Sequence, residues 1–167
     1  MPDRHLTIGV VVAGKTLRSG SWGQHVWLPH AILPSAPAAA AGARLGGDDK
    51  AAYVYAGAFD LCLHRAATSH YRDNLVSPRP AIWIALQDSG EYFEIGTVTA
   101  DPYEGEALTE GIGMTVEAVP MPENIQAAVW AFVAAFHVER PFVKRKRDRA
   151  ATDARRRSGP EAIAHGR

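Results

Sequence analysis

The sequence predicts an α+β domain in which a mostly antiparallel sheet or partial barrel packs on one long C-terminal helix. Three observations support this fold class. Short segments rich in Val, Ile and aromatic residues recur between turn signals, as in strands. One late segment, residues 122–137, repeats apolar side chains at helical spacing. From about Lys144 the chain turns to Arg, Lys, Asp and Ala, and we expect a disordered basic tail there.

The expected strands begin near the N-terminus. Residues 6–13 form an apolar run typical of a buried strand. Residues 14–23 are rich in glycine and serine, and we expect a turn-rich connection. Residues 24–33 indicate a second strand, which Pro29 places at an edge or a bulge. Residues 34–50 combine Pro, Ala and Gly, and this composition favours a surface loop.

The middle of the chain predicts further strands and a hairpin. Residues 52–63 keep aromatic and apolar side chains at one parity, so we expect a strand pair or one long bent strand. Residues 68–75 indicate a short polar helix or turn. Two apolar segments, 81–86 and 92–99, flank the turn signal at residues 88–90, which is a hairpin signature.

The C-terminal part predicts two helices around a last strand at residues 114–119. Asp101 as cap and Pro102 at the first helical position start a short helix. The long helix is expected over 122–137. Trp130 and several alanines lie away from its main apolar face, so we expect this helix to be covered on more than one side. The main face carries Ile125, Val129, Phe132, Val133 and Phe136.

The charge of the chain divides at the end of the expected domain, which we place at residues 1–143, with the tail at 144–167. The whole chain has no net charge, but residues 1–139 carry 8 Lys and Arg against 15 Asp and Glu. Residues 140–167 carry 10 against 3. A basic tail on an acidic body predicts that the tail contacts something anionic.

Composition also bounds the location of the protein. Cys62 is the single cysteine, so an intrachain disulfide is excluded and a reducing compartment is favoured. The longest apolar stretch, residues 125–138, falls short of the roughly 20 residues that span a bilayer. The N-terminal apolar run is shorter than the core of a signal peptide. We therefore expect a cytoplasmic protein without membrane insertion.

A first candidate site is a phosphate-binding turn at Gly14, Lys15 and Arg18. Backbone N–H groups and a basic side chain bind phosphates in such turns. The segment resembles the nucleotide-binding start of the molybdopterin-guanine dinucleotide transferase family. A surface turn is the alternative, because the double glycine and the lysine expected beyond Gly20 are missing.

The sequence predicts neither a metal site nor a catalytic motif. Cys62 and His64 would share one face of a strand, but spacing places no third or fourth ligand beside them. We therefore expect no metal, no cofactor and no catalytic residues.

The remaining candidate surface would bind a protein partner, with Phe142 as its anchor. The aromatic residues of this surface could instead be part of the core. Its basic run could instead be a solubilising tail or a tail that binds nucleic acid. The sequence does not favour nucleic acid, since no recognition fold is evident. The candidate residues are Trp22, Trp27, Tyr71, Asn74, Pro102, Tyr103, Glu104, Phe142, Lys144, Arg145, Lys146 and Arg147.

Several segments in order resemble an uncharacterised bacterial domain family. They are VVVAGKTLRSGSWGQHVWLPHAILP, YAGAFDLCLHR, YRDNLVSPRPAIWIAL, VTADPYEGEAL and VEAVPMPENIQAAVWAFVAAFHVERPFVKRKRDR, which together cover nearly all of residues 6–149. Genes of this family commonly lie beside those for molybdenum-dependent formate dehydrogenases and iron–sulfur proteins. Some members carry the label molybdopterin-guanine dinucleotide biosynthesis protein A. The resemblance supplies no catalytic residues.

The resemblance implies an accessory or assembly protein for a molybdenum-dependent formate dehydrogenase or a related molybdoenzyme. It would act by binding the cofactor or a protein partner, such as a subunit of the enzyme or a chaperone. The alternative is a nucleotidyltransferase-like enzyme that uses Gly14, Lys15 and Arg18 at a GTP phosphate. The third function class is nucleic-acid binding through the basic tail.

Overall fold

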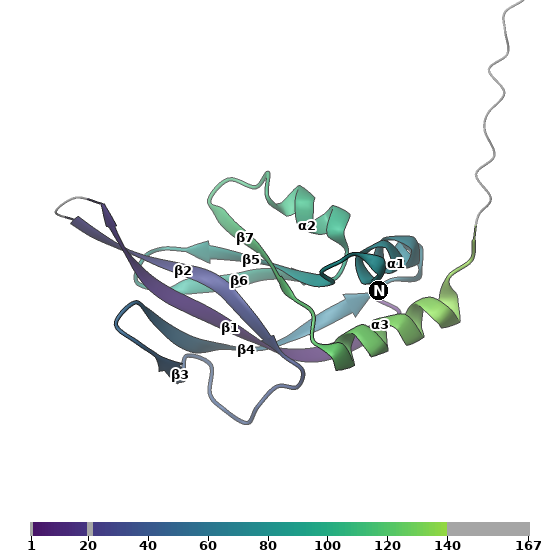
Figure 1. Ribbon diagram of the computed structural model, residues 1–167, viewed down its shortest axis with the longest axis horizontal. Helices are drawn as coiled ribbons and strands as arrows, with labels where there is room; N and C mark the ends of the chain where they lie inside the picture. Colours follow the sequence, from purple (N-terminus) through teal and green to yellow (C-terminus); the bar gives the residue numbers. More distant parts are fainter. Residues whose placement is uncertain (1, 20–21, 140–167) are drawn as a thin grey trace, which may run out of the picture.

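The computed structural model describes residues 2–19 and 22–139 as two antiparallel sheets and three α-helices (Figure 1). The first sheet has the order β2-β1-β4-β3 and the second β6-β5-β7. The strands of the two sheets are β1 (Arg4–Ser19), β2 (Trp22–Leu33), β3 (Arg44–Gly47), β4 (Ala51–Leu63), β5 (Ala81–Asp88), β6 (Phe93–Thr99) and β7 (Met114–Pro120). The helices of the protein are a short 3₁₀ turn η1 (Arg65–Ala67), α1 (Thr68–Val76), α2 (Pro102–Leu108) and α3 (Glu123–Phe136).

The expected turn-rich connection at residues 14–23 is wrong, because β1 continues to Ser19 and β2 begins at Trp22. Gly14 lies within the ladder, opposite Trp27 of β2. A Cβ atom at this glycine would lie 2.8 Å from the indole ring. The glycine therefore makes room for a tryptophan instead of turning the chain, and periodicity alone cannot distinguish these two roles.

Other expectations for the first sheet are confirmed or refined. Pro29 lies on an edge strand at a shift in register between β1 and β2. Residues 51–63 form one long strand, and Gly57, with φ of 130°, lies where its pairing with β1 shifts. The expected loop 34–50 contains the short strand β3, whose exposed residues give no apolar signal.

The second sheet is a hairpin with one added strand. β5 lies in its centre, with β6 and β7 antiparallel on its two sides. The expected turn joins β5 to β6, and Gly90 within it has φ of 83°, which favours glycine. Both sheets, α1 and α3 contribute to one apolar core, which includes Ile8, Val10, Val12, Leu61, Leu63, Tyr71, Ile82, Ile84, Val119, Val129 and Phe132.

The coarse fold class, α+β with antiparallel sheets, is confirmed, but a single long C-terminal helix is not. Three helices pack on two sheets, and α3 is the longest at 14 residues. The start of α2 agrees with its predicted cap: Asp101 Oδ1 accepts from the N–H groups of Tyr103 and Glu104. Among the described helices, none is both long and apolar enough to cross a membrane.

The covering of α3 also differs from expectation. Its inner face, which carries Ile125, Val129, Phe132 and Val133, is buried. Its outer face is exposed, and the side chain of Trp130 is 42% accessible. Within the part of the chain that the structure describes, α3 is therefore covered on one face only. Helical spacing shows that both faces are apolar, but it cannot show how many of them have a partner.

Candidate functional site

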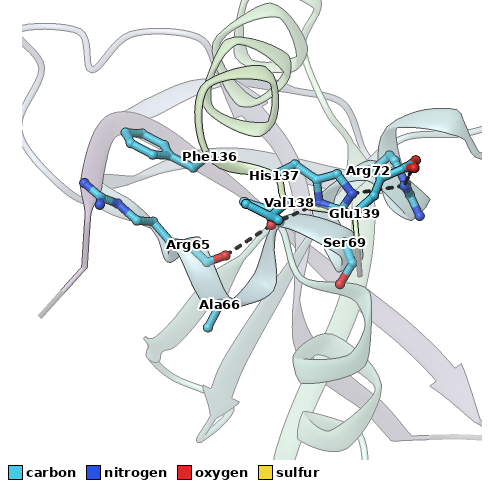
Figure 2. Close-up of a pocket in the computed structure, with 9 residues that line it drawn as sticks. Arg65, Ala66, Ser69, Arg72, Phe136, His137, Val138 and Glu139 are labelled. Carbon is cyan, nitrogen blue, oxygen red and sulfur yellow. Dashed lines mark hydrogen bonds and ion pairs between the residues drawn. The ribbon is translucent and has the colours of Figure 1, made fainter. Parts of the chain in front are cut away.

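The candidate site is an open hollow of about 910 Å³ at the junction of α1 with the end of α3 (Figure 2). Figure 2 shows Arg65 and Phe136 on one side of it and Arg72, His137 and Glu139 on the other. We call this cavity the arginine hollow. It is lined by Arg65, Ala66, Thr68, Ser69, Arg72, Phe136, His137, Val138 and Glu139.

The two arginines come from two consecutive elements. Arg65 begins the 3₁₀ turn η1 and lies beside Phe136, whereas Arg72 lies on α1 on the other side of the hollow (Figure 2). Ser69 and Arg72 are three residues apart on α1 and therefore share one face of that helix. The guanidinium of Arg65 stacks on the ring of Phe136, 4.2 Å from its centroid. This contact attaches the start of the helical segment to the end of α3.

A chain of hydrogen bonds joins the opposite wall of the hollow. Thr68 Oγ1 donates to the carbonyl of Arg65 at 3.1 Å, and His137 Nδ1 lies 3.2 Å from the same oxygen of Thr68. Arg72 Nη1 lies 3.1 Å from His137 Nε2. Because a guanidinium only donates, this contact is a hydrogen bond in the tautomer in which Nε2 accepts and Nδ1 donates to Thr68. The chain fixes the point at which the polypeptide leaves α3.

The two arginines are incompletely paired with carboxylates. Arg65 Nε lies 3.2 Å from Asp3 Oδ1. Arg72 lies 3.8 Å from Asp73 and 3.6 Å from Glu139, both longer than a hydrogen bond. The side chains of Arg65 and Arg72 are 61% and 39% exposed. Guanidinium groups bind carboxylates and phosphates in bidentate fashion, so the hollow can bind an anionic group.

A second hollow, of about 370 Å³, lies on the other side of α1, against α2 and the second sheet. Trp83 of β5 packs directly under α2, where a Cβ atom on Gly105 would overlap its indole ring. Tyr103 is exposed and packs against His70 with its ring tilted, the ring centroids being 4.4 Å apart. We call this cavity the aromatic hollow. Its lining includes Asp73, Asn74, Arg79, Trp83, Pro102, Tyr103 and Glu106.

His70 beside the aromatic hollow is oriented by a carboxylate. Its Nδ1 lies 2.7 Å from Oδ2 of Asp101, a nearly buried residue whose other oxygen caps α2. A histidine held in this way can act as a general base when a hydroxyl or thiol lies within reach. In residues 2–19 and 22–139, no such group hydrogen-bonds to His70 Nε2.

Three of the predicted partner-binding residues come together in the aromatic hollow. Asn74, Pro102 and Tyr103 line it. Glu104 lies on α2, as Pro102 and Tyr103 do, and accepts a hydrogen bond from Thr99 Oγ1 at 2.6 Å. Tyr71 is buried and does not line the hollow, and Asn74, which lines it, is only 3% exposed.

Tyr71 and Asn74 instead hold α1 in place. Asn74 donates to the carbonyls of Ala81 and Ala100 and accepts from the N–H of Ala81. The hydroxyl of Tyr71 accepts from the N–H of His64 at 3.1 Å. Burial raises the pKa of Tyr71, and the hydrogen bond from His64 opposes this shift only in part.

The predicted tryptophans lie at the other end of the second sheet. Trp27 packs against His25 and Phe93, and its backbone N–H donates to Asp88 at the end of β5. Because strands rise about 3.3 Å per residue, Asp88 lies roughly 20 Å from Ala81, which lines the aromatic hollow. Trp22 begins β2, still further from α2 along the hairpin. Trp27 therefore does not share a surface with Tyr103.

The remaining predictions fall on β1 or beyond the described residues. Gly14, Lys15 and Arg18 lie on β1, where Gly14 pairs with Trp27 on one side and Ala52 on the other. No glycine-rich turn forms at Gly14. Outside the described residues lie the predicted domain end at residue 143 and Phe142, Lys144, Arg145, Lys146 and Arg147.

Cys62 pairs with a different histidine from the one considered in the sequence. Its Sγ lies 3.6 Å from Nδ1 of His5, its cross-strand neighbour on β1. Among residues 2–19 and 22–139, no three His, Cys, Asp or Glu side chains are grouped to hold a metal ion.

The arginine hollow was missed because it combines two parts of the chain 60 to 70 residues apart. The spacing of Arg65, Ser69 and Arg72 on a polar helix was its single local signal. Residues 7–146 match a family described as Protein of unknown function (DUF3305). No curated protein and no solved structure matches the chain.

Proposed function

The chain belongs to the DUF3305 family, and we propose that it is an accessory or assembly protein for a molybdenum-dependent formate dehydrogenase or a related molybdoenzyme. It acts by binding and not by catalysis. The observation that carries this proposal is the arginine hollow, in which two half-exposed guanidinium groups lie beside an apolar ring. This combination fits an acidic protein surface with an apolar residue at its centre.

The basic run of the chain is tethered close to the same hollow. Lys144 follows Glu139 by five residues, and five residues span at most about 18 Å. Residues 1–139 carry a net charge of −7 and residues 140–167 a net charge of +7, so positive charge is concentrated in the part of the sequence that follows α3. An acidic partner that approaches α1 would meet Arg65, Arg72 and the basic run together, which favours fast and oriented association.

The proposed identity of the partner rests on the resemblance of the chain to a family whose genes lie beside those of formate dehydrogenases. A subunit of that enzyme or its chaperone would supply the acidic surface, or the phosphates of the molybdenum cofactor would supply the anionic group. The nucleotidyltransferase alternative has no support from the geometry of Gly14, Lys15 and Arg18, because their backbone belongs to a sheet. No observation in the described residues favours nucleic acid.

The test is affinity purification of the tagged full-length chain from its natural host. We expect a molybdoenzyme subunit or its chaperone to co-purify in low salt and to be lost as salt rises. The double variant Arg65→Glu/Arg72→Glu should lose this partner. Lys15→Glu/Arg18→Glu is the matched control, because it makes the same change of charge at the other end of the protein. Partner recovery that is unchanged in the Arg65/Arg72 variant, or no molybdoenzyme component at all, would refute the proposal.

A further inference from the structure

The outer face of α3 is apolar along most of its length. Every residue from 127 to 136 is Ala, Val, Trp or Phe. Ala127, Ala131 and Ala134 are exposed on the outer face, together with Trp130, whose side chain is 42% accessible. Figure 1 shows α3 along one edge of the molecule. A helix that is apolar all round is normally buried on all sides, yet within residues 2–19 and 22–139 this outer face of α3 is exposed.

We infer that the partner of this face is a second copy of the chain, which packs its own α3 antiparallel against the first. The exposed residues of the outer face are placed symmetrically about a midpoint between positions 130 and 131. In an antiparallel pair centred there, Ala127 faces Ala134 of the second copy, and Trp130 faces Ala131. Each indole ring thus meets a small side chain, and the alanines allow the helix backbones to approach closely.

Charge supports the antiparallel direction. Glu123 is exposed at the start of α3, whereas Arg65 contacts Phe136 at its end. Antiparallel packing brings each Glu123 to the end of the helix that carries the partner's arginine. Parallel packing would instead bring two Glu123 side chains together, and it would align the two helix dipoles unfavourably.

The length of the helix limits the strength of the dimer. A helix of 14 residues is about 21 Å long, so a contact confined to α3 lies at the small end of stable protein interfaces. We therefore expect a reversible monomer–dimer equilibrium with a dissociation constant on the order of micromolar. On the side of Arg72 the arginine hollow stays open in this arrangement, because Arg72, Ser69 and His137 lie on α1 or beyond the end of α3, whereas Arg65 lies near Glu123 of the second copy.

Sedimentation equilibrium of the full-length chain over a wide concentration range tests the dimer. We expect the average mass to rise from monomer to dimer, and Trp130→Glu to remain monomeric throughout. Tyr92→Glu is the control, since Tyr92 is 68% exposed in the turn before β6. A wild-type chain that stays monomeric at all concentrations, or a Trp130→Glu variant that still dimerises, would overturn the inference.

Disulfide trapping in a Cys62→Ser background tests the direction of packing. Ala131→Cys lies close to the twofold axis and should form a disulfide-linked dimer on mild oxidation. Ala127→Cys alone should not, because the two copies of this residue are about 10 Å apart along the axis. Mixing Ala127→Cys with Ala134→Cys chains should restore cross-linking. Efficient cross-linking of Ala127→Cys by itself would show parallel packing and refute the antiparallel pair.

Discussion

The inner and outer faces of α3 are both apolar, yet only one of them belongs to the core. Phe132 on the inner face is 1% exposed and packs against Tyr71 of α1 and Phe136. Trp130, two positions earlier, is 42% exposed on the opposite face. The comparison separates two uses of apolar surface within one helix: the inner face stabilises the fold, and the outer face is available for association. Four substitutions test this distinction.

The largest expected effect is on the inner face. Phe132→Ala should lower the free energy of unfolding by about 3–5 kcal/mol, because it removes a large buried side chain and leaves a cavity. Urea unfolding followed by circular dichroism measures this change. Phe136→Ala is the matched control: the same side chain is removed where it is 37% exposed, so the loss should be clearly smaller. Equal losses in the two variants would contradict the difference in burial between Phe132 and Phe136.

Asn74 tests how α1, which packs on this inner face, is held against the second sheet. Asn74→Ala should cost about 1–3 kcal/mol, because it leaves buried backbone groups of Ala81 and Ala100 without their partner. Asn124→Ala is the control, since its amide makes one long, exposed bond to Pro34. A loss in the Asn124 variant as large as that in the Asn74 variant would show that burial does not decide the effect.

These residues also show how far the sequence predicts the structure. Local signals were sufficient for α2, where Asp101 and Pro102 define the start, and for the hairpin turn at residues 88–90. They failed at Gly14, because a glycine that accommodates Trp27 resembles a glycine that turns the chain. The arginine hollow could not be predicted, since η1, α1 and the end of α3 meet only in three dimensions.

Alkaline pH gives a further test of the inner face through Tyr71. Burial raises the pKa of Tyr71 above its ordinary value of about 10. The unfolded chain therefore loses its proton first, and the stability that is present below pH 10 falls as pH rises toward the folded pKa. Urea unfolding between pH 8 and 11 should show this decline. Tyr71→Phe should flatten it, whereas Tyr103→Phe, at an exposed position, should not.

The smallest expected effect on stability belongs to the outer face. Trp130→Ala removes a larger side chain than Phe132→Ala, yet it should change the free energy of unfolding of the monomer by no more than about 1 kcal/mol. The reason is that Trp130 does not belong to the apolar core, and most of its contacts would lie in the dimer. Dimer formation adds stability only at concentrations near or above the dissociation constant. The difference between wild type and Trp130→Ala should therefore grow with protein concentration in thermal unfolding, while the difference for Phe132→Ala should stay nearly constant. A large loss for Trp130→Ala that is the same at every concentration would place this tryptophan in the core of the monomer and remove the distinction between the two faces.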